Sequence, residues 1–445
     1  MKKLTFKGGV HPEYCKDLSL TEPLKEAPLP NVAVVPLSQH IGAPNTAVVK
    51  KGDVVEEGQI LGRSDSFVSS CVHSPVFGKV LDIKTAFHPT LGMTPSVFVE
   101  RDKNKPSKKY SFTAKKIEEI SCRELISEIK DAGIVGMGGA AFPTHVKLSV
   151  PDGKKIKTLI INGAECEPYL TCDNILMRQK TKEIWEGIKI LDRILHPQKI
   201  YIAIENNKKD AYLAFQKIFE GAQGEIMTRT KIVLLKTKYP QGGEKQLIKA
   251  ISGKEVPPAA LPIDIGFLVQ NVGTAYAVYE AVYCNKPLIE RVVTLSGDCL
   301  NEPGNYILRV GVTVKELIEE GTISLKEEPK KIIAGGPMMG TAQIGTDFSI
   351  LKNTSGVLFL SDNSVRIYEE DVCIKCAKCV DVCPVNLTPT EIAKNVKKGY
   401  WDKVEEQYVS DCMECGACAY ICPARIPLVQ YIKEGKLAVS KKKKI

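Results

Sequence analysis

Eight of the 15 cysteines lie between Cys373 and Cys422, in two runs with the same spacing. Each run reads C-x2-C-x2-C-x3-C-P, and every cysteine of the first run has its equivalent 39 residues later. In two-cluster proteins with this spacing, the fourth cysteine of each run binds the cluster of the other run. The spacing therefore predicts two [4Fe–4S] clusters with crossed ligand sets: Cys373, Cys376, Cys379 with Cys422, and Cys412, Cys415, Cys418 with Cys383.

Zinc is the alternative metal for such a segment. Structural zinc sites use four ligands per ion, typically as two C-x2-C pairs, so two complete four-cysteine runs followed by proline fit zinc poorly. Between the runs, Thr388 and Pro389 have the residue types of a helix N-cap and first turn. Apolar residues then recur at helical spacing, with a break at Gly399. We therefore expect the clusters to lie among helices.

A glycine-rich loop is the second candidate site. Gly136, Gly138 and Gly139 follow a helix-like segment over residues 122–132, and Lys147 comes shortly afterwards. Closely spaced glycines let backbone N–H groups approach an anion, and the lysine adds a positive charge. The alternative is that this segment is an ordinary turn. The polar residues at the strand ends, described next, favour a ligand-binding loop.

Polar residues follow apolar runs that are typical of buried parallel strands, at residues 157–161, 199–204 and 231–235. In α/β folds, ligands bind beyond the carboxyl ends of such strands. The alternation of strands and helices over residues 119–285 predicts a doubly wound α/β domain. Candidate ligand-binding residues at the strand ends and nearby helix starts are Asn162, Glu165, Glu167, Tyr239, Gly242, Glu244, Asn271 and Thr274.

These motifs, in this order, resemble the NADH- and FMN-binding subunit of respiratory complex I. With the two cysteine runs behind them, they are most similar to the RnfC component of the Rnf (Rsx) electron transport complex. The segments 6–12 and 36–42 also look like that component, so the resemblance covers essentially the whole chain. The chain differs from the complex I pattern at Ala164, where an acid is expected, and at Val150, where an aromatic residue is expected.

The resemblance implies FMN and NAD(H) as cofactors, beside the two [4Fe–4S] clusters. Phe142 would pack against the nicotinamide, and Glu167 would lie beside the site of hydride transfer. Core packing is the alternative for Phe142 and Tyr239, and a solvated surface position is the alternative for Lys147. The remaining implied cofactor contacts are Gly136, Gly138, Gly139, Lys147, Asn162, Glu165, Tyr239, Gly242, Glu244, Asn271 and Thr274.

The whole chain is expected to be a multidomain α/β protein. Residues 30–100, with alternating apolar and polar residues and glycine turns, resemble a barrel-sandwich hybrid of the biotinyl/lipoyl type. Carrier domains of that type hold their cofactor on a lysine at a hairpin tip, but the matching turn here, at residues 65–71, has no lysine. The loop 335–340 is interpreted as a turn, with contact to a cofactor as the alternative. The expected units are a barrel-sandwich domain (1–100), a basic linker (101–118), a Rossmann-like FMN/NAD domain (119–285), a β-grasp (SLBB) module with its connection (286–370), a helical two-cluster ferredoxin-like domain (371–430) and a basic tail (431–445).

The net charge of +9 is local and does not indicate a nucleic-acid partner. Residues 101–109 carry +4 and the segment from Lys436 carries +5, which accounts for all of it. The tail lysines are either a lipid contact or a solvated tail. No apolar run approaches the ~18 residues that a membrane span needs. The first residues lack the apolar stretch of a secretory signal, so we expect reduced cysteines rather than disulfides.

The resemblance implies an oxidoreductase subunit of an ion-translocating ferredoxin:NAD+ complex, peripheral on the cytoplasmic face of the membrane. Its expected partners are the other Rnf-type subunits, including a ferredoxin-like subunit and integral membrane subunits, and ferredoxin indirectly. The alternatives are a soluble cobalamin reductase of the microcompartment type and an electron-transfer subunit without nicotinamide binding. Fractionation with membranes and flavin reduction by NADH would separate these possibilities.

Overall fold

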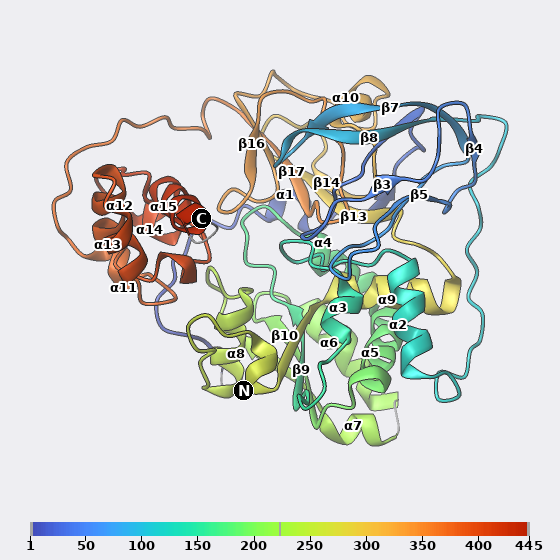
Figure 1. Ribbon diagram of the computed structural model, residues 1–445, viewed down its shortest axis with the longest axis horizontal. Coiled ribbons are helices and arrows are strands. Elements are labelled where there is room, and N and C mark those ends of the chain that lie inside the picture. The colour runs from blue at the N-terminus through green and yellow to red at the C-terminus, as the bar shows by residue number, and fades with distance from the viewer. Residues whose placement is uncertain (1–2, 222–223, 443–445) are drawn as a thin grey trace.

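Alternating apolar residues and glycine turns fold residues 32–101 into two small antiparallel sheets, with strand orders β2-β8-β7-β4 and β3-β5-β6. The computed structural model, which describes residues 3–221 and 224–442, shows them beside each other (Figure 1). They enclose a core of valine, leucine and alanine side chains. The strands are β2 (Val32–Pro36), β3 (Thr46–Ala47), β4 (Val54–Val55), β5 (Ile60–Arg63), β6 (Val72–His73), β7 (Gly78–His88) and β8 (Gly92–Arg101). The expected β-rich N-terminal unit is thus present.

A four-stranded parallel sheet of order β11-β10-β9-β12 forms the centre of the next unit. Successive residues of a strand face opposite sides: Leu159 and Ile161 belong to one core with α2, α5 and α9, and Ile160 belongs to another with α8. Helices therefore cover both faces of the sheet, as expected. The elements are α2 (Cys122–Asp131), α3 (Thr144–Leu148), β9 (Thr158–Gly163), α4 (Cys172–Gln179), α5 (Thr181–Leu195), β10 (Lys199–Glu205), α6 (Lys209–Gly221), α7 (Glu225–Arg229), β11 (Thr230–Leu235), α8 (Glu244–Ser252), the 3-10 helix η1 (Pro262–Ile265), β12 (Phe267–Asn271) and α9 (Val272–Cys284).

A mixed six-stranded sheet of order β1-β14-β13-β17-β15-β16 follows in the chain and packs on its own apolar core. Its edge strand β1 comes from near the N-terminus and pairs in parallel with β14. Its elements are α1 (Asp17–Leu20), β1 (Leu24–Glu26), β13 (Glu290–Ser296), β14 (Gly304–Arg309), α10 (Val314–Glu319), β15 (Lys331–Ala334), β16 (Thr341–Gln343) and β17 (Gly356–Leu360).

Parts of the segment before β2 pair with other units, although this segment lies within the expected unit 1–100. Leu4 forms a parallel bridge with Leu235, and Val10 pairs with Tyr239, both in the unit of the parallel sheet. The Gly9 amide donates to the Val382 carbonyl in the C-terminal unit at 2.8 Å. This segment therefore connects three units, which hydrophobic periodicity within the segment could not reveal.

The cysteine runs lie in a small helical unit, at the left of Figure 1, with an apolar core of its own. The prediction of a basic tail at 431–445 needs correction. Up to Lys442 this segment is part of the helix α15, and its Ile432 and Val439 are buried in this core. Residues 443–445 lie outside the described part. The elements are α11 (Lys378–Asp381), α12 (Pro389–Lys397), α13 (Trp401–Glu406), η2 (Val409–Asp411), α14 (Ala417–Ile421) and α15 (Leu428–Lys442).

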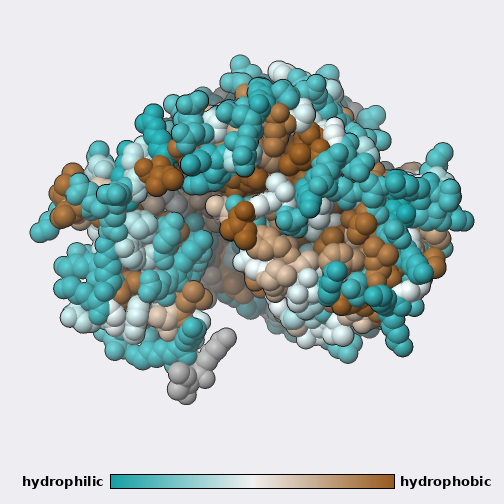
Figure 2. Space-filling view, turned by 90° about the horizontal axis from the view of Figure 1, so that it is seen from above, coloured by the Kyte–Doolittle hydropathy of each residue, from teal (hydrophilic) through white to brown (hydrophobic). Residues whose placement is uncertain are grey.

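Figure 2 shows a mostly hydrophilic surface with small hydrophobic patches, and a notch between the lobe at the left and the rest of the molecule. Of the helices in the described ranges, none has both the length and the apolar character that crossing a membrane requires.

A buried lysine holds three units together. Lys352, with no exposed surface, donates from Nζ to the carbonyl of Cys71 in the barrel-sandwich unit and, at 2.7 Å, to that of Gly133 before the glycine loop. Its own carbonyl accepts from Arg291 on β13 at 2.6 Å. A charge in the interior is costly unless it is both paired with an opposite charge and hydrogen-bonded. Lys352 Nζ donates to two neutral carbonyls, so the ammonium connects the units at an energetic cost.

This cost should appear as a pH dependence of stability. Burial lowers the pKa of Lys352 from 10.5 to about 7, so between these values the unfolded chain binds more protons than the folded chain. The free energy of unfolding should therefore rise with pH across this window. We expect Lys352→Met to reduce that slope in denaturant titrations between pH 6 and 10, whereas the exposed Lys330→Met should not. An unchanged slope in Lys352→Met would contradict the assignment.

Candidate functional site

The strand ends of the parallel sheet converge as predicted. Asn162 at the end of β9 lies opposite Asn271 at the end of β12 in the strand register. The side-chain Nδ2 of Asn162 donates to the carbonyl of Gly242, in the loop after β11, at 2.9 Å. Carboxyl ends of parallel strands meet at one edge of the sheet, and three of the candidate segments are brought together there.

The glycine loop packs over the start of α9. The Met137 amide donates to the Thr274 hydroxyl at 3.0 Å, and Gly138 packs against the Asn271 side chain. Asn271 is the N-cap of this 13-residue helix and accepts from the Gly273 amide at 2.7 Å. A Cβ on Gly139 would meet no atom within 4 Å. The loop therefore leaves room for an anionic ligand beside a helix N-terminus, where the helix dipole favours negative charge.

Lys147 and Glu244, both predicted site residues, contact each other. Lys147 on α3 donates from Nζ to a Glu244 oxygen at 2.8 Å and to the Val269 carbonyl at 3.0 Å. Both side chains are about one-third exposed, so Lys147 is neither buried in a core nor fully solvated. Phe142 is half-buried, and its carbonyl closes the glycine loop by accepting from the Gly136 amide at 2.9 Å.

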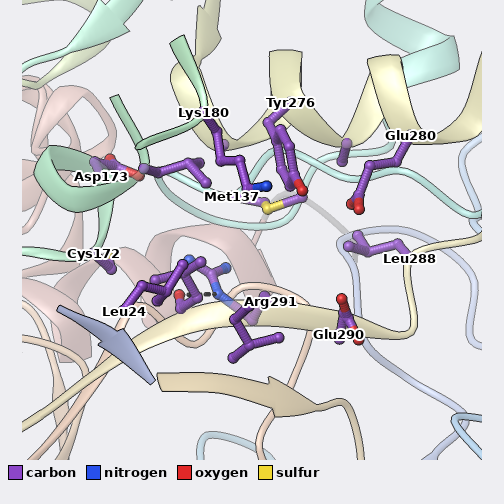
Figure 3. A pocket seen from close by; sticks show the side chains of 15 residues that line it. Leu24, Met137, Cys172, Asp173, Lys180, Tyr276, Glu280, Leu288, Glu290 and Arg291 are labelled. Atoms are coloured by element: carbon purple, nitrogen blue, oxygen red, sulfur yellow. Dashed lines mark hydrogen bonds between the residues drawn. The ribbon is translucent and has the colours of Figure 1, made fainter. Parts of the chain in front are cut away.

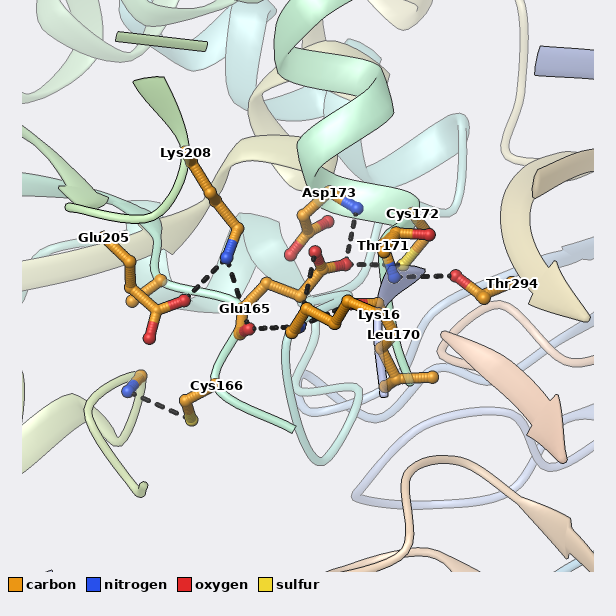
Figure 4. Close-up of polar contacts among 12 residues, drawn as sticks. Lys16, Glu165, Cys166, Leu170, Thr171, Cys172, Asp173, Glu205, Lys208 and Thr294 are labelled. Atoms are coloured by element: carbon orange, nitrogen blue, oxygen red, sulfur yellow. Dashed lines mark hydrogen bonds and ion pairs between the residues drawn. The ribbon is translucent and has the colours of Figure 1, made fainter. Parts of the chain in front are cut away.

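Glu165 points into a buried charged cluster instead (Figure 4). Its Oε1 accepts from the Asp173 amide at the start of α4, at 2.8 Å, and Lys16 Nζ lies 3.9 Å from its Oε2. Lys208 donates to Glu205 at 2.6 Å and to the main-chain carbonyl of Glu165 at 3.4 Å. Burial, and then the Glu165 charge, raises the pKa of Asp173 to about 6. Sequence reasoning missed this cluster because its members are far apart in the chain.

Behind the glycine loop lies a cavity of about 40 Å³, between α9 and β13 (Figure 3). Met137 and Gly273 line it on the side of the loop, and Arg291, Glu280 and Glu290 contribute charged groups. This volume suffices for one or two water molecules, which need polar partners of this kind.

Glu167 lies at the junction of three units. Its two carboxylate oxygens accept from the amides of Met338 and Met339, at 3.0 and 2.9 Å. Tyr239, which is buried, donates its hydroxyl to the Cys415 carbonyl at 2.6 Å. The loop 335–340 was predicted as a turn, with a cofactor contact as the alternative. It contacts Glu167 of the parallel-sheet unit, and no local sequence pattern indicated that contact.

The two cysteine runs have matching backbone geometry. Lys375 and Glu414 occupy equivalent positions with φ of 55° and 59°, and both donate their amides to a cysteine sulfur, at 3.4 and 3.3 Å. Ala377 and Gly416, two residues later in each run, also have positive φ. Such loops direct amides at sulfur, as iron–sulfur clusters require.

The shifts in the pKa values of the cysteines are consistent with the crossed arrangement, which stays a prediction. Beyond the effect of burial, the charges of Cys412 and Cys383 raise the pKa of Cys415, to about 12, and Cys422 raises that of Cys379. All 15 cysteines are free thiols. Within the ranges the structure describes, no three His, Cys, Asp or Glu side chains form a group that would hold a single metal ion. A cubane differs, because each thiolate binds a separate iron.

The clusters would differ in exposure. Cys373 and Cys376 are exposed, whereas the set of Cys383, Cys412, Cys415 and Cys418 is buried or half-buried. The buried set borders the parallel-sheet unit: a Cβ on Gly243 would lie 2.7 Å from the Met413 side chain. The fold and site thus indicate an electron-transfer protein with an anion-binding α/β domain and two iron–sulfur sites.

Comparison with known proteins agrees with this class. The chain belongs to the RnfC family, whose members are components of ion-translocating ferredoxin:NAD(+) oxidoreductase complexes. The family models that match are the RnfC barrel sandwich hybrid domain at residues 4–104, the Nuo51 FMN-binding domain at 129–280 and a 4Fe-4S dicluster domain at 366–423.

Similar proteins include component C of the proton-translocating ferredoxin:NAD(+) oxidoreductase complex of Clostridium ljungdahlii, 44% identical over 96% of this chain and 93% of that protein. Component C of the Na(+)-translocating complex of Acetobacterium woodii is 42% identical over 92% and 91%. A chain of an H2-reduced NAD+-reducing [NiFe]-hydrogenase has a TM-score of 0.50 at 16% identity. That match covers 74% of this chain and 63% of the other, and it supports the fold alone.

Proposed function

We propose that this chain passes electrons between NAD(H), FMN and two [4Fe–4S] clusters, as the RnfC component of a membrane-bound ferredoxin:NAD+ oxidoreductase. The names of its relatives support this proposal. The observation that carries it is the direct contact between the two cofactor regions, where Tyr239 of the strand-end loop bonds to Cys415 of the buried cysteine set. Flavins exchange two electrons with nicotinamide and single electrons with clusters, so adjacent sites form one path.

The order of the path follows from exposure. The flavin would lie beside the buried set (Cys383, Cys412, Cys415, Cys418), and the set with exposed Cys373 and Cys376 would exchange electrons with a partner. We assign this partner role to a ferredoxin-like subunit, with ferredoxin acting indirectly. The chain would lie peripherally on the cytoplasmic face, beside integral membrane subunits.

Domain types and boundaries belong to this proposal. The parallel sheet supports a Rossmann-like FMN/NAD domain at 119–285, and the mixed sheet supports an SLBB β-grasp module at 286–370. The cluster domain would begin at 371 and include α15. Residues 102–116, without helix or strand, fit the proposed linker at 101–118.

FMN would be held by the glycine loop, the strand ends and the start of α9. Gly136, Gly138 and Gly139 supply the close backbone approach, and Asn271 with Thr274 positions the helix N-terminus. Lys147 and Glu244 would exchange their mutual ion pair for contacts to the cofactor. Asn162, Gly242 and Tyr239 form the adjoining wall, and Phe142 would face the nicotinamide. Glu165, whose carboxylate accepts from the Asp173 amide at the start of α4, would support that wall from the side away from FMN.

Lys147→Ala is expected to lower the FMN content of the purified protein several-fold, because it removes the cation beside the phosphate site. Flavin released on denaturation, measured per chain by fluorescence, gives the result. Lys154→Ala, a half-exposed lysine in an ion pair with Asp264, is the matched control. Full flavin occupancy in Lys147→Ala would show that the lysine belongs to the surface.

Two measurements test the function as a whole. The anaerobic chain should contain FMN and about eight irons, and NADH should reduce first the flavin and then the clusters. In cells, the protein should fractionate with membranes and with integral Rnf-type subunits. Flavin that stays oxidised with NADH would indicate an electron-transfer subunit without nicotinamide binding, and association with corrinoid enzymes would indicate a cobalamin reductase.

A further inference from the structure

The loop Gly335–Gly340 joins β15 to β16 in the mixed sheet, yet its tip leaves that sheet. It reaches Glu167 of the parallel-sheet unit and Gly416 of the buried cysteine run. A Cβ on Gly416 would lie 2.9 Å from the Met338 carbonyl, so the two loops are in direct contact. One short loop thus contacts both of the proposed cofactor regions.

Glu167 holds this loop by two main-chain hydrogen bonds. Oε2 accepts from the Met338 amide at 3.0 Å, and Oε1 accepts from the Met339 amide at 2.9 Å. Hydrogen bonds to a carboxylate are stronger than neutral ones. A Cβ on Gly336 would lie 2.3 Å from Oε2, so glycine is needed there to let the carboxylate approach.

The other side of the loop covers the buried cysteine set. Met338 packs in one apolar cluster with Cys166, Tyr239 and Cys415. Tyr239 bonds to the Cys415 carbonyl at 2.6 Å, so the flavin-side wall reaches the same cysteine loop directly. The potential of an iron–sulfur cluster depends in part on solvent exposure. Because Met338 packs beside Cys415, its position affects the exposure of that cysteine.

We infer that Glu167 is a positioning residue for electron transfer: through the Met338 and Met339 amides, it fixes the loop Gly335–Gly340 over the cluster of Cys383, Cys412, Cys415 and Cys418. The inference rests on the proposed function and changes the role that family resemblance gave to Glu167. A carboxylate oriented toward two loop amides acts on that cluster rather than on the nicotinamide.

Gly336→Ala tests this inference from the side of the loop, without altering any residue of the flavin site. Its new methyl group would push the loop away from Glu167. In the anaerobic full-length protein loaded with FMN and iron, we expect flavin reduction by NADH within about twofold of wild type. Reduction of the Cys383-containing cluster should slow at least tenfold, and its midpoint potential, followed by EPR, should shift.

Glu167→Gln, which keeps the shape and removes the charge, should give the same shift in cluster potential. It should also speed amide hydrogen exchange across residues 335–340, a readout that needs no activity. Gly345→Ala, whose Cβ would meet no atom within 4 Å, and Glu302→Gln, which is 80% exposed, are the matched controls.

Two results would overturn the inference. One is an unchanged cluster potential and unchanged exchange in both variants. The other is slow flavin reduction by NADH in Glu167→Gln with a normal cluster potential, which would place the carboxylate at the nicotinamide. Failure of the proposed function is seen separately, because wild-type flavin would then stay oxidised with NADH.

Discussion

Cys383→Ala is expected to leave the protein with about four irons instead of about eight, because one cluster loses a ligand while the other stays complete. The lost cluster should be that of Cys412, Cys415 and Cys418, although Cys383 belongs to the other run. Beyond the effect of burial, the charge of Cys383 raises the pKa values of Cys412, Cys415 and Cys418, which is consistent with this outcome. Iron analysis and EPR of the reduced protein measure it. NADH-dependent reduction of the remaining cluster should fail, since the missing cluster lies between it and the flavin.

Cys422→Ala is the reciprocal variant and should remove the other, exposed cluster while the buried one is still reduced by NADH. Cys299→Ala, a buried free cysteine of the mixed-sheet unit, is the matched control with full iron. If Cys383→Ala instead removes the cluster of Cys373, Cys376 and Cys379, the crossed ligation is incorrect.

Gly138→Ala is expected to abolish tight FMN binding while the iron content stays unchanged. The new Cβ would lie 2.9 Å from the side-chain Nδ2 of Asn271 and 3.1 Å from the Asn271 Cβ, closer than side chains pack. Either the glycine loop or the N-cap of α9 must move, and an N-cap is worth about 1 kcal/mol by itself. We expect at least a tenfold rise in the FMN dissociation constant, which is about 1.4 kcal/mol, and a matching loss of NADH oxidation with ferricyanide.

Gly221→Ala provides the control in the same unit, because a Cβ there meets no atom within 4 Å. Its flavin and iron content should equal those of wild type. Flavin titration into the flavin-free protein, followed by fluorescence quenching, gives the dissociation constant. If Gly138→Ala binds FMN as tightly as wild type, the glycine loop does not contact the cofactor.

The sequence predicted those parts of the site that depend on local patterns. Cysteine spacing predicts that Cys383 binds the cluster of the second run, which the Cys383→Ala variant tests. Apolar runs ending in polar residues predicted that Asn162 would lie at the carboxyl edge of a parallel sheet, because parallel strands align their carboxyl ends. The break at Gly399 separates α12 from α13, where its φ is 68°.

Other parts depend on contacts between distant segments, and the sequence could not predict them. Lys352 looks like any lysine until its burial is known, and a glycine-rich loop at 335–340 looks like an ordinary turn. The contact between Glu167 and Met338 joins residues 171 positions apart. The helix α15 was missed for another reason: its lysines hide a buried face of Ile432 and Val439.

The N-terminal segment that connects three units also constrains how the protein is made. Gly9 bonds to Val382, and β1 pairs with Asn305–Ile307, so these early residues leave the ribosome long before their partners exist. At about 5–20 residues per second, the partner of Gly9 is made roughly 20–75 seconds later. Until residues 305–307 have been made, β1 remains unpaired and open to wrong pairing. The units can therefore reach their final arrangement only after residue 382 has been made, which delays completion of the cofactor path to the same point.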